Sequence, residues 1–152
     1  MTVADRFPYW IENAPAGGFL CRFPDFPDFA PEAPTLEKLL NGLLNAIIPV
    51  LEEHIKSGKP PIQERALNPG EEYLSLSPTL SVKLQLIYAV RERRITAHDL
   101  ARRIGCYPQE ATRILKFSHP TKIDTLNAAV EAIGGRLDCR VSLVTEHLPV
   151  ID

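Results

Sequence analysis

The clearest pattern of apolar positions lies in residues 95–122, where two short helical periods meet at a glycine. Gly105 suits the left-handed residue that ends a helix, and Pro108 suits the first position of the next helix. Thr96, with Asp99 three residues later, suits the start of the first helix as a capping box. The apolar positions at helical spacing are Leu100, Ala101, Ile104, Ala111, Ile114 and Leu115. The pattern predicts a helix-turn-helix.

Before this stretch, the apolar pattern predicts a small sheet. Residues 7–12 and 19–23 have the composition of strands, and the turn sequence at 13–18 makes them a hairpin. A short irregular strand is expected near Phe29, in a region rich in Pro, Asp and Phe. Residues 71–76 have the pattern of a last strand that returns beside the hairpin.

One long helix precedes that last strand. Thr35 suits its cap, a broad apolar face recurs along it to Ile55, and Gly58 ends it. Pro49 lies inside the pattern and should kink the helix or shift its start. The order βββαβ, or ββαβ without the irregular strand, predicts one helix packed on a small sheet.

After a link at residues 78–80, the pattern becomes mainly helical. Ser81 is expected to cap a helix that runs to Arg93, and Thr121 to cap a last helix beyond the helix-turn-helix. Residues 136–144 then alternate apolar with polar side chains, which predicts a one-sided strand. Because its surroundings are helical, we expect this strand to pair with the same strand of a second chain, giving a homodimer or a higher homo-oligomer. The alternative is that it joins the first sheet of its own chain.

The second helix of the motif turns a polar face outward. Glutamine, threonine and arginine suit base edges, and arginine and lysine also neutralise phosphates. Ser118 and Lys122, at the entry to the next helix, suit a phosphate contact. The expected DNA-contacting residues are Gln109, Glu110, Thr112, Arg113, Lys116, Ser118 and Lys122. Double-stranded DNA is therefore the expected partner of this face, against the alternative of a helix pair with an unrelated purpose.

The composition is that of an ordinary soluble protein, since 45% of the 152 residues are hydrophobic and 24% are charged. No apolar run approaches the ~20 residues of a membrane helix, and residues 1–13 lack the pattern of a signal peptide. We therefore expect a cytoplasmic protein with no membrane partner. Cys21, Cys106 and Cys139 are far apart and odd in number, so they are expected to be small apolar fillers rather than disulfide or zinc residues. No cofactor is expected.

The net charge of −2 conceals an asymmetry between the two halves. Residues 1–80 hold 6 basic and 11 acidic residues, whereas residues 81–152 hold 11 basic and 8 acidic residues. Between residues 81 and 122, nine basic residues face three acidic ones. The split suggests two partners of opposite sign, with a polyanion on the C-terminal side. Small domains often differ this much by chance, so the asymmetry only supports the motif.

Together these features resemble the HicB antitoxins of HicA–HicB toxin–antitoxin systems, over nearly the whole chain. In the N-terminal half, the matching positions are Pro8-Tyr9, Gly17-Gly18-Phe19, residues 23–27, Thr35 with Glu37, and residues 58–62. In the C-terminal half, they are Leu80-Ser81, Lys83-Leu84, residues 100–105, Gln109-Glu110, Thr112-Arg113, His119 and residues 121–124. The chain departs from the family pattern at Asp28, at residues 29–34 and at Lys38, which leaves the path of the third strand open.

The resemblance implies an α+β protein with two parts. Residues 1–77 would be a partial RNase H-like unit that binds the toxin, and residues 78–152 a helix-turn-helix unit that dimerises and represses the operon at its operator. The implied partner is a HicA-type toxin, a small basic ribonuclease with a double-stranded-RNA-binding fold, and the antitoxin itself is not catalytic. Blocking a cationic surface takes negative charge and an apolar anchor. The expected toxin-binding residues are Asp25, Phe26, Asp28 and Glu32.

Other readings of the first half stay open on the sequence. Phe23 and Phe26 could simply be core residues, or could line an apolar groove through which a helix-turn-helix regulator senses a small ligand. A nuclease would need several convergent carboxylates. Asp25, Asp28 and Glu32 share one loop, and no further acidic residue stands on a matching strand. The four histidines are scattered, without a partner suited to nucleophilic catalysis.

Overall fold

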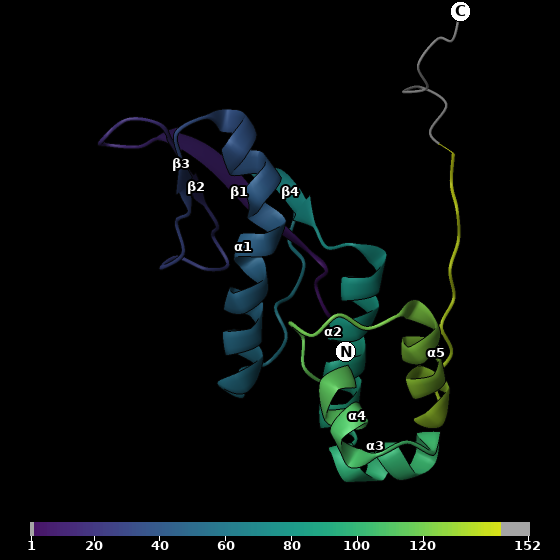
Figure 1. The fold of residues 1–152 in the computed structure, drawn as a ribbon. Helices are drawn as coiled ribbons and strands as arrows, with labels where there is room; N and C mark the ends of the chain where they lie inside the picture. Colours follow the sequence, from purple (N-terminus) through teal and green to yellow (C-terminus); the bar gives the residue numbers. More distant parts are fainter. Residues whose placement is uncertain (1, 144–152) are drawn as a thin grey trace, which may run out of the picture.

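The computed structural model describes residues 2–143 of the chain. This part combines a four-stranded antiparallel sheet with five helices (Figure 1). The strands are β1 (Arg6–Asn13), β2 (Phe19–Arg22), β3 (Glu32–Ala33) and β4 (Glu72–Ser75). The helices are α1 (Leu36–Lys56), α2 (Pro78–Glu92), α3 (Ala97–Ile104), α4 (Pro108–Ile114) and α5 (Ile123–Ala132). The fold is therefore mixed α and β, as predicted.

The sheet has the order β3-β2-β1-β4, so the hairpin lies in its middle and the strand after α1 returns beside β1. The third strand lies at Glu32–Ala33 rather than near Phe29. The chain reaches β2 only there, where Cys21 N donates to the Pro31 carbonyl at 3.0 Å. Phe29 instead stacks on Phe23, with ring centroids 5.4 Å apart. That strand was thus predicted a few residues too early.

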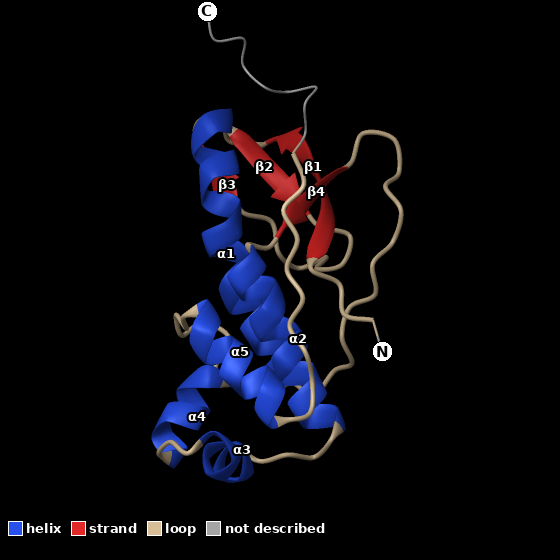
Figure 2. Cartoon of the chain, turned by 90° about the vertical axis from the view of Figure 1, so that its right-hand side faces the viewer, coloured by secondary structure: helices blue, strands red, loops and turns tan. Residues whose placement is uncertain are grey.

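Helix α1 packs along one face of the sheet (Figures 1 and 2). The hydroxyl of Thr35 accepts from Lys38 N at 3.2 Å, and Gly58, with φ +76°, follows the helix end, so both ends are as predicted. Pro49 lies inside the helix and has not shifted its start. The buried residues of α1 are Leu39, Leu43, Ile47, Leu51 and Ile55.

Helix α2 begins before the predicted position. Ser77 caps it by accepting from Leu80 N at 3.3 Å, and Pro78 occupies the first turn, where its missing N–H has no helical partner to lose. The expected link at residues 78–80 is therefore helical. Ser81 is not a cap but a buried residue whose hydroxyl donates to Asp5 Oδ2 at 2.6 Å.

The buried apolar residues form two clusters that meet at α2. One contains the sheet, α1 and one side of α2, together with Phe117 from the segment after α4. The other contains the opposite side of α2, where Leu86 and Val90 lie, with α3, α4 and α5. Helix α2 is thus shared by both clusters.

Helix α5 starts at Ile123 and has no side-chain cap. Thr121 was predicted as that cap, but its hydroxyl is engaged by the ammonium of Lys83 at 2.6 Å. Beyond α5, residues 136–143 form no strand in the described part of the chain, and Val144 lies outside it. Val141 is 92% exposed and Leu143 is 81% exposed. The alternative in which this segment joins the sheet of its own chain is therefore wrong for the residues described. Pairing with a second chain stays a prediction.

Within residues 2–143, no helix is both long and apolar enough to cross a membrane.

Candidate nucleic-acid interface and acidic groove

Helices α3 and α4 are joined at Gly105, which has the left-handed φ of +84°. The capping box at the start of α3 is complete: Thr96 Oγ1 accepts from Asp99 N at 3.0 Å, and Asp99 Oδ2 accepts from Thr96 N at 3.2 Å. These hydrogen bonds, with one from Arg102, lower the pKa of Asp99 to about 2. Ala101 is buried, and Pro108 opens α4. The capping box, the left-handed glycine and the proline at the start of the second helix are therefore confirmed.

Helix α4 buries Ala111 and Ile114 and turns its polar side chains to solvent. The hydroxyl of Thr112 donates to the Pro108 carbonyl at 3.0 Å, which leaves the oxygen free to accept. The solvent-exposed residues among those predicted to contact DNA are Gln109, Glu110, Thr112, Arg113, Lys116, Ser118 and Lys122. The structure thus gives all of them an accessible position.

Three of these residues share one shallow recess between α4 and the start of α5. Glu110, Arg113 and Lys122 line it, and its volume is about 300 Å³. Ser118 is placed differently, because its hydroxyl donates to Glu52 Oε1 of α1 at 2.9 Å. The Ser118 hydroxyl, which was predicted to bind a phosphate, is therefore hydrogen-bonded to a carboxylate instead.

Lys83 is a polar residue of this region whose role was not predicted from the sequence, where it is only one of the positions that match the family. It is only 1% exposed, and its ammonium donates to the carbonyl oxygens of Arg113 (3.2 Å) and His119 and to Thr121 Oγ1 (2.6 Å). Burial lowers its pKa to about 8, although Glu52 opposes that shift. The sequence does hold one signal of this burial: Lys83 lies four residues before the buried Ile87, so the two share one face of the helix.

A groove of about 620 Å³, the acidic groove, lies between the loop after β2 and the second half of α1. Asp25, Phe26 and Asp28 line its loop side, and Glu53 and His54 line its helix side. Phe26 is 8% exposed and packs edge-on against the His54 ring at 6.2 Å, so it is both a core residue and part of the groove wall. Three of the predicted toxin-binding residues therefore meet here.

Glu32, the fourth of them, is exposed on β3 and does not line this groove. Phe23 is 2% exposed and belongs to the core beside the sheet, where its ring lies 5.9 Å from that of Tyr9. The core reading of Phe23 is thus the one the structure supports.

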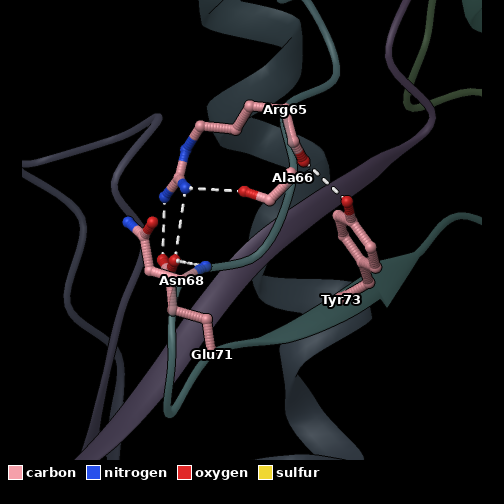
Figure 3. A network of polar contacts seen from close by, with 5 residues as sticks. All are labelled: Arg65, Ala66, Asn68, Glu71 and Tyr73. Carbon is pink, nitrogen blue, oxygen red and sulfur yellow. Dashed lines mark hydrogen bonds and ion pairs between the residues drawn. The ribbon is translucent and has the colours of Figure 1, made fainter.

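The loop after α1 is held by a network around Glu71 (Figure 3). Arg65 donates to both Glu71 carboxylate oxygens, at 3.2 and 2.8 Å, and Asn68 N donates to one of them at 2.7 Å. Tyr73 completes the network by donating to the Arg65 carbonyl at 2.6 Å. Burial raises the pKa of the nearby Asp25, and the positive charge of Arg65 opposes that shift.

The described residues hold no cluster of three or more histidine, cysteine or acidic side chains that could bind a metal. Cys21 is buried, as expected of an apolar filler, and burial raises the pKa of its thiol to about 12. Cys139 is exposed, so the filler interpretation is wrong for that residue.

No established family profile matches the chain. Antitoxin HicB 1 of Photorhabdus laumondii is 32% identical over 133 residues, which cover 87% of this chain and 84% of that protein. Antitoxin HicB of Escherichia coli is 28% identical over 132 residues, covering 87% and 96% of the two chains. A second Photorhabdus laumondii protein, antitoxin HicB 2, is 28% identical over 133 residues. The chain therefore belongs to the HicB antitoxin family.

Proposed function

We propose that this antitoxin binds and neutralises a small HicA-type, mRNA-cleaving toxin and represses its own operon by binding operator DNA. The observation that carries the proposal is the similarity to HicB antitoxins along 87% of the chain, which includes both the acidic groove and helix α4. Residues 1–77 would be the toxin-binding part, a partial RNase H-like unit. Residues 78–152 would be the helix-turn-helix and dimerisation part.

The toxin-binding surface we propose is the groove beside Phe26. Its acidic residues Asp25, Asp28 and Glu53 suit a basic partner, and Phe26 with Phe29 offers apolar area for an anchoring side chain. Neutralisation by this surface requires only that the toxin's RNA-binding face be covered. The proposed role is therefore non-catalytic.

The DNA-binding surface we propose is the exposed face of α4. In a helix-turn-helix the second helix lies in the major groove, which gives Gln109, Thr112 and Arg113 access to base edges. Lys116 and Lys122 would neutralise phosphates on either side. Both partners, the operator and a newly made toxin, are cytoplasmic, so the cytoplasm is the proposed place of action.

Co-expression tests both halves of this function. In this experiment the chain is produced from its own operon together with the neighbouring gene, which we expect to encode the toxin. We expect the toxin to copurify with the chain and cell growth to be protected. A reporter behind the operon's promoter should be repressed. The antitoxin role would be contradicted if the chain purified without the product of the neighbouring gene and that product still arrested growth.

A second function is favoured by one observation, the size of the groove. A volume of about 620 Å³ lies in the range of small-molecule sites, so a ligand-sensing regulator without a toxin partner fits the same residues. The operon experiment separates the two, since a ligand sensor would repress its promoter but capture no neighbouring protein.

A further inference from the structure

A buried lysine fixes the end of the helix that we propose reads the operator. Lys83 lies on α2, and its ammonium has three N–H donors. All three are used: one on the carbonyl of Arg113 in the last turn of α4, and two on His119 O and Thr121 Oγ1 in the segment that follows. A positive charge at the C-terminal end of a helix also complements the helix dipole.

The same segment is anchored to the first half of the chain. Phe117 is 2% exposed and belongs to the cluster of the sheet and α1, not to the cluster of α3, α4 and α5. Next to it, Ser118 donates to Glu52 of α1 at 2.9 Å. Figure 1 shows this segment extending from α4 toward the lower part of α1. The end of α4 is therefore held from α2 and from α1 at once.

We propose that Lys83 is a positioning residue for operator recognition: it orients α4 through the Arg113 backbone, while Phe117 and Ser118 tie that orientation to α1. The inference rests on the proposed repressor function. Lys83 is buried and acts on DNA only through the residues that it holds. Arg113 connects the two roles, because its carbonyl is held by Lys83 while its side chain is exposed on the DNA-facing side. Base readout depends on side-chain placement within about 0.5 Å, so a loosened end of α4 would be felt directly.

The protonation of Lys83 offers a test that does not need a variant. Glu52 of α1 is the charged side chain acting on Lys83, and Arg113, His119 and Thr121 face it with uncharged oxygens. Loss of the proton above pH 8 leaves two donors for three acceptors and removes the charge. We expect the hold on α4, and with it operator affinity, to weaken between pH 7 and 9.

Global stability should respond to this group in the opposite direction. The unfolded lysine keeps its ordinary pKa of 10.5, so above pH 8 the unfolded chain binds more protons than the folded one. Titration of Lys83 therefore raises the free energy of unfolding as the pH rises from 8 to 10.5. A loss of affinity in that direction cannot come from unfolding caused by this lysine.

The experiment compares Lys83→Met with Lys38→Met, an exposed lysine on α1, in the full-length chain. Fluorescence anisotropy on a duplex from the protein's own promoter is measured from pH 7 to 9, beside a scrambled duplex. We expect Lys83→Met to lose about tenfold or more in affinity and part of its preference for the promoter sequence, the size of one lost base contact. The wild type and Lys38→Met should weaken toward pH 9, whereas Lys83→Met should not.

If Lys83→Met does not fold, Thr121→Val and the wild-type pH series decide. Thr121→Val removes one acceptor of the three, and we expect a smaller loss in the same direction. Affinity within twofold of the wild type in the folded variants, or a flat wild-type profile, overturns the inference alone. Absence of any promoter binding by the wild type overturns the repressor role and the inference with it.

Discussion

The residues that we propose bind DNA divide into two groups by what their side chains can reach. Arg113 projects from the exposed face of α4, and Lys122 stands just before α5 on the other side of the same recess. We expect Arg113→Ala to cost about 1–3 kcal/mol in operator affinity and to relax sequence preference, because it removes a base contact. We expect Lys122→Ala to weaken binding to all sequences and to lower the salt slope by about one.

Mobility shifts on the operon's own promoter at several salt concentrations measure both effects. Lys56→Ala, at an exposed lysine in the last turn of α1, is the control for loss of a positive charge alone. Equal and salt-independent losses for the two variants would contradict the assignment of base and phosphate contacts.

The acidic groove is expected to bind the toxin through its negative charge. Asp28 and Asp25 line the groove, and Asp28 is the more exposed of the two. Asp28→Lys should weaken toxin binding at least tenfold, because it places a positive charge opposite a basic partner. Asp25→Lys should do more, but its carboxyl is partly buried, so the lysine also disturbs the loop.

Copurification and growth protection by co-expression are the measurements, with Glu37→Lys in the first turn of α1 as a charge-matched control away from the groove. Full protection by both groove variants would remove this loop from the toxin interface.

Single residues could be predicted from the sequence where their interactions are local. Gly105, Thr96 and Asp99 were identifiable because capping and left-handed turns depend on neighbours in sequence. The partners of Lys83 and Ser118 were not identifiable, since they lie 30 or more residues away on other elements. A lysine on an apolar helix face is visible in the sequence, but its acceptors are not.

The elements were easier to predict than their boundaries. Helix α1, the hairpin and β4 follow from the period of apolar positions alone. The start of α2 was misplaced because Ser77 and Ser81 are both plausible caps, and only the packing of Ser81 against Asp5 distinguishes them. Thr121 was predicted to cap α5, but its hydroxyl accepts a hydrogen bond from Lys83 on another helix.

Helix α3 gives a prediction about pH. The pKa of Asp99 is about 2 in the folded chain and has an ordinary value of 3.8, so its stabilising contribution is complete above pH 3.8 and is lost as the pH falls through 2. Asp99→Asn should lower the melting temperature at pH 7, and the difference from the wild type should shrink between pH 4 and 2. Thr96→Ala should cost about 1 kcal/mol through the other half of the box.

Thermal melts of the full chain at several pH values provide the measurement. Asp124→Asn makes the same change in the first turn of α5, which has no side-chain cap, and should have a smaller effect at pH 7. A pH-independent difference for Asp99→Asn would show that the carboxylate charge does not stabilise the helix start.

At the scale of the whole molecule, the two halves are connected through α2. Arg91 on α2 donates to the carbonyl of Ile55 in the last turn of α1, and Ser81 on the same helix donates to Asp5. The apolar cluster of the sheet and α1 also extends beyond residue 77, because it includes Leu84, Ile87 and Phe117. A period of apolar positions predicts which face of a helix is buried, but it cannot show that α2 is buried on two sides by two different clusters.

The C-terminal segment of the described chain is the expected site of assembly. Residues 136–143 carry an alternating pattern, yet Val141 and Leu143 are exposed and unpaired in the described part of the chain. Pairing with the same segment of a second chain would bury these side chains and place two α4 helices roughly 34 Å apart, the length of one DNA turn. We expect light scattering of the full chain to give a dimer or larger species, and deletion of residues 137–152 to give a monomer with weak operator binding. Val141→Lys, which changes only the pairing face, should act in the same direction, with Arg140→Lys as the conservative control. A truncated chain that remains dimeric and still binds a palindromic operator would place the dimer contact elsewhere.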